Sequence, residues 1–310
     1  MDDLASSTTQ PFEVLWLNIN GINSNHSDCN VSLLIRSFLR SNYSILFLQE
    51  PRLKEVKAKD VEKAFNWPNS KVQGFFTSNE AGNGGVATVV KKAFLQTVAN
   101  FLVVELAKDE CQHVTFSVGH TQFSFANLHL NSRSGSKRGQ VCTTLKDTLP
   151  HGTIIGGDFN MVQDLTLDLQ RPHSTTPYDN GGWQEMVDMQ THLGLTDIWR
   201  ENNGDSFFFT HQSAVPGGHT RTRIDYILCP THHTVGPHGI TTSHDHVFWQ
   251  GNERADHVGV SLKMTPIDIA QAGPKREAAP PHVFETQQWH ELHEQHWESH
   301  MLRLEAHPTI

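Results

Sequence analysis

The five residues Gly156–Asn160, with the sequence GGDFN, directly follow the short run Thr153–Ile155. This pattern predicts a buried strand that carries polar groups into a cleft at its carboxyl end. Residues two apart in a strand face the same side, so we expect Asp158 and Asn160 to project together. A carboxylate beside an amide suits a hard cation or a phosphate. Since the same residue types are common in turns, this stretch alone leaves a plain turn open.

Other apolar runs also end in polar residues. Four more predicted strands carry polar residues at their carboxyl ends. These residues are Asn18 and Asn20 in LNING, Glu50 in LFLQE, Asn127 and His129 in FANLHL, and Asp225 in RIDYIL. A sixth stretch, ADHVGV, places Asp256 and His257 at the start of a strand. Functional residues concentrate at strand ends and loops that a rigid scaffold holds. One such stretch could be a cap or a turn, but six together indicate a shared site.

The residue types indicate separate roles. Glu50 is a lone acid before Pro51, either a surface acid that starts a turn or a ligand of a divalent ion, and oxygen ligands with waters indicate Mg²⁺ or Mn²⁺. His257 is the natural general base, because histidine titrates near neutral pH unaided; the alternative is a structural histidine. A carboxylate must fix the tautomer of such a base. Neighbours in an extended chain face opposite sides, so we expect Asp225 to do this and Asp256 to approach the metal.

The chain preceding residue 131 must hold these groups in place. A strand over Phe12–Asn18, a helix over Val31–Leu39 and a strand over Ile45–Leu48 indicate a layered α/β arrangement. A short helix over Asp60–Phe65 and a run of antiparallel strands with Gly, Asn or Asp in their turns follow. These strands are predicted at Val72–Phe76, Gly85–Val90, Thr97–Leu106, His113–Val118 and Gln122–Leu130.

The alternation of helix and strand then repeats. Helices are predicted at Lys137–Leu149 and Gly182–Leu193, on either side of a strand over Ile154–Asn160. The last strands are predicted at Leu195–Trp199, Ser206–His211, Arg221–Leu228 and His257–Met264. This order of elements favours a sandwich of two sheets with helices outside.

Composition changes mark three segments. We predict a disordered leader at 1–11 and one domain over 12–265. Residues 266–310 are predicted to form a Pro/Ala-rich linker and an amphipathic helix whose apolar face binds a partner surface. The HELHEQH stretch of the tail resembles a HExxH zinc motif but fails it, because Glu294 and Trp297 stand where the second histidine is needed.

Charge and cysteines narrow the classes of protein. No apolar run is long enough for a transmembrane helix, and the acidic start lacks a secretory signal. Four scattered cysteines favour reduced thiols and an intracellular location. The net charge of −9 speaks against avid non-specific DNA binding but leaves a local basic groove open. Arg133, Lys137 and Arg138 follow His129 and are candidates to track a DNA backbone, or else form a solvated loop.

The ordered set LNINGIN, LQE, GGDFN, RIDYIL and DH, over roughly Phe12 to Met264, resembles the endonuclease/exonuclease/phosphatase superfamily. Within it, LNINGIN, LGLTDIWRENNGDSFFFTH and RTRIDYIL are most similar to the endonuclease domains of LINE-type (non-LTR) retrotransposons. The resemblance implies a four-layer α/β/β/α sandwich of two mainly antiparallel sheets flanked by helices. It also implies metal-dependent phosphodiester hydrolysis, DNA as the substrate, a nuclear location and a reverse transcriptase downstream in a longer polyprotein.

The same resemblance implies roles for individual residues. Asn18 and Glu50 match metal-site residues, and the pair Asp158 and Asn160 matches the one that orients the attacking water and contacts the phosphate. The catalytic acid–histidine group is matched by Asp225, Asp256 and His257.

Two positions depart from the pattern and blur the substrate. Asn20 stands where abasic-site endonucleases have an acid. The retrotransposon proteins also have asparagine at this position. NLHL replaces the YxPN motif, so His129 is expected to assist the leaving group, and Asn20 and Asn127 are expected to contact substrate. RNA is therefore a second candidate partner. An RNase or deadenylase, a lipid or inositol phosphatase, and an inactive binding module stay open as alternatives.

Overall fold

The computed structural model describes residues 11–22, 27–77, 84–172, 177–215, 218–231, 241–248 and 256–265. The predicted leader, apart from Pro11, and the predicted linker and tail lie outside these residues. In the described part of the chain, no helix is long and apolar enough to cross a membrane. Cys111, Cys142 and Cys229 are buried and unpaired.

A first sheet of six strands holds the amino-terminal part of the site. Its order is β14-β15-β1-β2-β4-β3. The strands are β1 Phe12–Asn18, β2 Tyr43–Gln49, β3 Val72–Phe76, β4 Val86–Lys91, β14 Thr241–Phe248 and β15 Val258–Thr265. β1 and β2 are parallel, since the helix α1 (Ser27–Arg40) crosses between them, and Asn18 pairs in register with Gln49. The carboxyl ends of both strands therefore lie at one edge.

A second sheet of six strands has the order β10-β13-β8-β7-β6-β5. Its strands are β5 Ala99–Ala107, β6 Cys111–Val118, β7 Thr121–His129, β8 Ile154–Asp158, β10 Leu195–Asp197 and β13 Asp225–Pro230. Helix α4 (Gly135–Thr148) joins the parallel strands β7 and β8, and β13 runs antiparallel to β8. A small third sheet, in the order β11-β12-β9, consists of β9 Leu169–Gln170, β11 His211–Val215 and β12 Gly218–Thr222.

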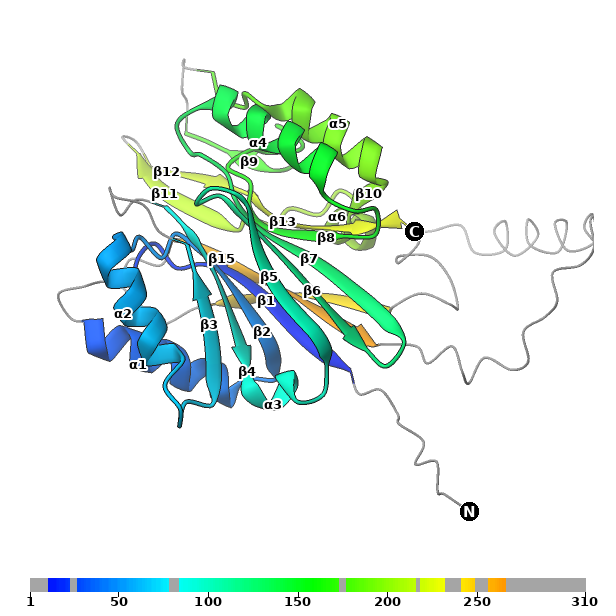
Figure 1. The fold of residues 1–310 in the computed structure, drawn as a ribbon. Helices are drawn as coiled ribbons and strands as arrows, with labels where there is room; N and C mark the ends of the chain where they lie inside the picture. The colour runs from blue at the N-terminus through cyan, green and yellow to red at the C-terminus, as the bar shows by residue number, and fades with distance from the viewer. Residues whose placement is uncertain are drawn as a thin grey trace, which may run out of the picture. The chain divides into compact units, whose positions relative to one another are not determined.

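The two large sheets face each other, and helices cover their outer faces (Figure 1). α1 and α2 (Glu55–Phe65) lie against the first sheet, with Leu34, Phe38 and Phe65 in the same buried cluster as its strands. α4 and α5 (Trp183–Leu193) cover the second sheet. Two short helices, α3 (Lys92–Leu95) and α6 (Ile198–Asn203), join strands. The predicted four-layer α/β/β/α arrangement is thus confirmed.

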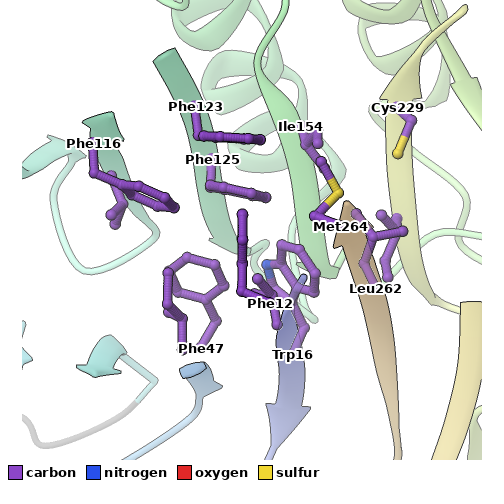
Figure 2. Close-up of a cluster of buried hydrophobic side chains, with 14 of the residues drawn as sticks. Phe12, Trp16, Phe47, Phe116, Phe123, Phe125, Ile154, Cys229, Leu262 and Met264 are labelled. Carbon is purple, nitrogen blue, oxygen red and sulfur yellow. The ribbon is translucent and has the colours of Figure 1, made fainter. Parts of the chain in front are cut away.

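Aromatic side chains fill the space between the sheets (Figure 2). Phe12 of β1 packs edge-on against Phe123 of β7, with ring centroids 5.1 Å apart. Trp16 and Phe47 from the first sheet lie 5.1 Å apart and both approach Phe125 of the second. Burying one such ring stabilises the fold by about 1.5–3 kcal/mol.

This packing explains the glycines of GGDFN. A Cβ placed on Gly156 would lie 2.5 Å from the Trp16 ring, and one on Gly157 would collide with the Leu128 carbonyl. Gly157 also has φ +139°, in the region that favours glycine. The strand that carries Asp158 is therefore pressed directly against the core.

Several predicted elements need correction. The strand expected over Leu195–Trp199 stops at Asp197, whose carboxylate accepts the Trp199 and Arg200 N–H groups and so starts α6. Ser206–Phe209 is not a strand. The strand expected over Arg221–Leu228 is split between β12 and β13.

A buried charge network accounts for that split. The Arg223 guanidinium donates to Asp168 at 2.8 and 3.0 Å and to Asp197 at 2.6 Å. A buried guanidinium must be paired. These contacts therefore keep Arg223 outside both strands, at the point where β12 ends and before β13 begins. The small sheet of β9, β11 and β12 was not predicted as a unit.

Candidate active site

Three polar side chains meet where strands of the second sheet end. His129 and Asp158 are register partners in parallel strands β7 and β8, and Asp158 and Asp225 are partners in antiparallel β8 and β13. Partners in register face the same side of a sheet. Asp225 is the first residue of β13, so its predicted place at a carboxyl end is wrong. It reaches the site because β13 runs antiparallel to β8.

Asp225 and His257 form a close pair. His257 Nδ1 lies 3.0 Å from one carboxylate oxygen of Asp225 and 3.2 Å from the other. Burial lowers the pKa of His257, but the Asp225 carboxylate, with smaller contributions from Asp158 and Asp256, raises it to about 10. The imidazole therefore carries a proton at neutral pH. His257 in this state holds positive charge rather than acting as a base.

Asp158 is the buried carboxylate on the other side of His257. Its Oδ2 accepts the Asn18 amide at 2.9 Å and lies 3.9 Å from His257 Nε2. Burial, and then repulsion by Asp225, raise the pKa of Asp158. A carboxylate with a raised pKa accepts a proton more readily, so Asp158 is better suited than His257 to take one from water.

Asn160 does not continue the strand as predicted. β8 ends at Asp158, and Asn160 has φ +49°. Its N–H donates to Asp158 Oδ1 at 2.9 Å, and its side-chain amide donates to the Leu130 carbonyl at 2.8 Å. The chain turns back at this point, because Asp158 binds the backbone two residues on. Asn160 thus supports Asp158 through its backbone.

Glu50 lies at the end of β2 with φ +51°. One carboxylate oxygen lies 3.1 Å from His129 Nε2, and the other accepts both Arg52 Nε at 2.7 Å and an Arg52 terminal nitrogen. Burial raises the pKa of Glu50, but His129 and Arg52 together lower it to about 2. The pKa of His129 is raised, since its bond to Glu50 and nearby charges outweigh burial. Glu50 is therefore ionised, paired with Arg52 and bonded to His129.

Asp256 directs its carboxylate to Asn20 and His211, and one of its oxygens also lies within 4.8 Å of a His257 ring nitrogen. Its Oδ1 accepts the Asn20 side-chain amide at 3.0 Å, and its Oδ2 lies 3.8 Å from His211 Nε2. The Asn20 N–H in turn donates to Asn18 Oδ1 at 3.0 Å. Asn20 and Asp256 thus line the site next to Asn18.

Two predicted substrate contacts are wrong. The Asn127 side chain is fully buried between the sheets, where it accepts the Gln49 amide at 2.6 Å and donates to the carbonyls of Leu48 and Ala87. Arg138 is 1% exposed, and its guanidinium donates to the backbone carbonyls of three loop residues, Asn131, Asp179 and Gly181. These side chains hold the scaffold together and cannot reach a ligand in this structure.

Arg133 and Lys137 are exposed beside the site. They line a cavity of about 680 Å³ that also reaches Glu50, Arg52 and His129. The cavity lining carries four cationic side chains, since Lys108 joins Arg52, Arg133 and Lys137, and the acids Glu50, Asp109 and Glu110 lie among them.

Thr210 and His211 belong to the site and were missed. Thr210 Oγ1 accepts the N–H groups of Ile224 and Asp225, each at 3.1 Å. The His211 ring packs on His257 with centroids 4.6 Å apart. The signal was present, because this Thr-His pair ends the aromatic run SFFF as other polar groups end apolar strands. A strand prediction over the whole stretch concealed it.

The donors at the ends of β1 and β2 fit a divalent cation. Glu50 is ionised and follows Gln49, the register partner of Asn18, so a carboxylate and an amide end neighbouring parallel strands. Oxygen donors of this kind are those that Mg²⁺ and Mn²⁺ take. Among the described residues, Asp158, Asp225 and His257 form another cluster of candidate ligands, with one atom of each within 4.8 Å of the others.

Comparisons with known proteins agree with this geometry. An abasic-site (AP) endonuclease of Leishmania major, LMAP, superposes with a TM-score of 0.67 at 14% identity, over 86% of this chain and 91% of that one. The endonuclease domain of TRAS1, a telomere-specific non-LTR retrotransposon, superposes with a TM-score of 0.54 at 15% identity, over 83% of this chain and all of that one. The chain therefore has the endonuclease/exonuclease/phosphatase (DNase I-like) fold.

A more specific similarity comes from sequence. Over 206 residues the chain is 26% identical to the uncharacterized 149 kDa protein of transposon TX1 of Xenopus laevis. The match covers 64% of this chain and 15% of the TX1 protein. No family model matches the chain.

Proposed function

We propose that this chain is a metal-dependent phosphodiesterase that nicks DNA, as the endonuclease part of a non-LTR retrotransposon protein. The observation that carries the proposal is the array Asp158–His257–Asp225, with His257 Nδ1 3.0 Å from Asp225 and Nε2 3.9 Å from Asp158. Structural similarity to the TRAS1 endonuclease and sequence similarity to the TX1 protein support the retrotransposon assignment.

In the proposed reaction, water attacks phosphorus in line and the bond to the leaving oxygen breaks. Asp158 takes the proton of the water, because its pKa is raised and both its oxygens are oriented by Asn18 and Asn160. The imidazolium of His257, held by Asp225, stabilises the added negative charge on phosphorus oxygens. His129, with its raised pKa, gives a proton to the leaving oxygen.

A divalent ion held by Glu50 and Asn18, with Asp256 as a further candidate ligand, would neutralise charge on the phosphate oxygens. Arg52, Arg133 and Lys137 would bind the flanking phosphates of the strand. The retrotransposon assignment carries with it a reverse transcriptase in the same polyprotein and a nuclear location.

A nicking assay tests the proposal. Supercoiled plasmid is incubated with the full chain and Mg²⁺ or Mn²⁺, with EDTA as the metal control and Asp158→Asn as the protein control. We expect conversion to the open circle only with metal and only with the wild type. Retardation of the plasmid without nicking in either metal would favour a binding module instead.

Parallel incubations with single-stranded RNA and with phosphoinositides test the other hydrolases of this fold. If RNA is cleaved, or phosphate is released from the lipid, at a higher rate than the plasmid is nicked, then RNA or the lipid is the substrate instead of DNA. The basic residues around the cavity favour a polymeric phosphodiester over a single phosphate ester.

A further inference from the structure

His211, Asp256 and His257 form a second cluster of candidate metal ligands, with one atom of each within 4.8 Å of the others. The proposed reaction leaves His211 without a role. We propose that this cluster, named here the His211 cluster, binds a late first-row transition-metal ion such as Zn²⁺ and that the ion inhibits the enzyme by taking His257.

In each histidine of the cluster a neighbour holds one ring nitrogen and leaves the other to bind an ion, which on His257 would displace the proton of that nitrogen. His211 Nδ1 lies 3.1 Å from Thr222 Oγ1, and His257 Nδ1 lies 3.0 Å from Asp225. Metal-bound histidines in proteins are oriented in this way, since a hydroxyl, carbonyl or carboxylate fixes the nitrogen that does not bind. The Asp225–His257 pair thus has the arrangement of a carboxylate–histidine–zinc unit.

The second ring nitrogen of each histidine lies near an acid. His211 Nε2 lies 3.8 Å from Asp256 Oδ2. His257 Nε2 has no hydrogen-bond partner among the described residues, the nearest acid oxygen being 3.9 Å away on Asp158, although the side chain is only 7% exposed.

The backbone holds the cluster in place. His211 and His257 form an isolated antiparallel bridge, and the Gln212 N–H donates to the Asp256 carbonyl at 3.0 Å. The Val258 N–H donates to the Thr210 carbonyl at 2.7 Å. The three ligands therefore come from two short segments fixed to each other on both sides, so little chain entropy is lost when they bind an ion.

The donor set selects the class of ion. Two imidazoles and one carboxylate suit Zn²⁺ and its transition-metal neighbours, whereas Mg²⁺ prefers oxygen donors alone. Ligands around a tetrahedral Zn²⁺, with bonds of about 2.0–2.1 Å, lie about 3.4 Å apart, so His211 and Asp256, 3.8 Å apart, need only a small closure, and His257, within 4.8 Å of both, needs at most about 1.4 Å. Asp256 has a side chain 36% exposed, which provides an entry path.

Zinc binding to the full chain is measured by competition with a chromophoric chelator in excess Mg²⁺. His211→Phe keeps the aromatic ring on His257 and removes the ligand nitrogen. His219→Phe, at an exposed position of the same hairpin, is the matched control for the many other histidines. We expect at least one site in the wild type and in His219→Phe that is tenfold or more weaker in His211→Phe. Equal zinc affinity in the wild type and His211→Phe would overturn the proposal.

Asp256→Asn replaces His211→Phe in this comparison if the latter does not melt like the wild type. The inhibition rests on the proposed function and is measured separately, as loss of Mg²⁺-supported nicking on addition of Zn²⁺. Each variant is compared with its own rate without Zn²⁺, and inhibition should be weaker in His211→Phe. Equal inhibition of both proteins would overturn the inhibitory role. A chain that never nicks DNA would refute the proposed function, while the chelator competition still decides the zinc site.

Discussion

Asp158 and Asp225 stand directly opposite each other on antiparallel strands, both almost fully buried, and His257 contacts both. Two buried acids side by side repel each other, and this repulsion contributes to the raised pKa of Asp158. The protonated imidazole balances them. The three groups therefore act as one electrostatic unit.

The pH dependence of stability follows from His257. Its folded-state pKa, about 10, is above the ordinary value of 6.5, so its contribution to stability is complete below about pH 6.5 and is lost as the pH rises through 10. We expect the melting temperature to fall between pH 7 and pH 10, and the slope to flatten in His257→Gln. Asp158 titrates at lower pH and does not obscure this window. Parallel slopes in the two proteins would contradict the assignment.

Loss of the Asp158 or the Glu50 carboxylate should slow the reaction without unfolding the protein. Asp158→Asn removes the proton acceptor, and Glu50→Gln removes the charged metal ligand. Each change should lower the nicking rate by about 10²–10³, the usual cost of one preorganised electrostatic group. For Glu50→Gln the Mg²⁺ concentration at half-maximal rate should also rise. A rate near that of the wild type for Asp158→Asn at saturating Mg²⁺ would remove this residue from the mechanism.

Asp225 and His257 should behave as a pair in a double-mutant cycle. Because Asp225 acts by holding the imidazole, Asp225→Asn should cost most of the rate that His257→Ala costs, and the double variant little more. Rates are compared under single-turnover conditions. Asp256→Asn is the control, since its carboxylate makes no hydrogen bond to His257 among the described residues and its loss should change the metal dependence instead. Simple additivity of the Asp225 and His257 losses would refute the pairing.

Variants of the basic segment after β7 should distinguish the residues that bind DNA from the one that stabilises the fold. Arg133→Ala and Lys137→Ala should each weaken DNA binding and reduce the slope of log affinity against log salt by about 0.9, because each removes one phosphate contact. Arg138→Ala should instead lower the free energy of unfolding by roughly 3 kcal/mol, since its buried hydrogen bonds to backbone carbonyls are lost. Salt titrations and urea unfolding of the three variants distinguish the two effects.

Gly156 should tolerate no side chain. A Cβ there would lie 2.5 Å from the Trp16 ring, so Gly156→Ala should cost about 1–3 kcal/mol or more through overpacking. Gly152→Ala is the matched control, because Gly152 has φ +92° but open space around it, and its cost comes from the backbone alone. The comparison is made by urea unfolding. A smaller loss at Gly156 than at Gly152 would contradict the packing argument.

Much of this arrangement follows from local pattern. The short apolar runs locate the strands that end at Asn18, Gln49 and His129, although alternation alone does not show that Asp256 and His257 offer ligand atoms within 4.8 Å of each other. The sandwich follows because each strand and helix buries one face. The GGDFN sequence marks the end of β8, although it does not show that the strand stops at Asp158.

Other features depend on contacts between distant parts of the chain. Asn127 and Arg138 have residue types that suit a ligand site, and only the position of the facing sheet or loop decides that they are buried. Asp225 was expected at the wrong end of its strand, because the direction of β13 is set by pairing with β8. His211 was missed since its relation to His257 arises from a bridge between segments 46 residues apart in sequence.

The polar residues between the two large sheets determine how these sheets are aligned with each other. Hydrophobic burial is non-directional, so apolar packing specifies the alignment of the two sheets less strictly than hydrogen bonds between them do. Gln49 bonded to Asn127, and Thr88 bonded to Gln112, permit one registration only, because a slip would leave buried amides unpaired. Gln49 precedes Glu50, and Asn127 stands two residues before His129. The distance between Glu50 and His129 is therefore set from within the sandwich, and a substitution in this buried interior would misalign the two halves of the site without touching either residue.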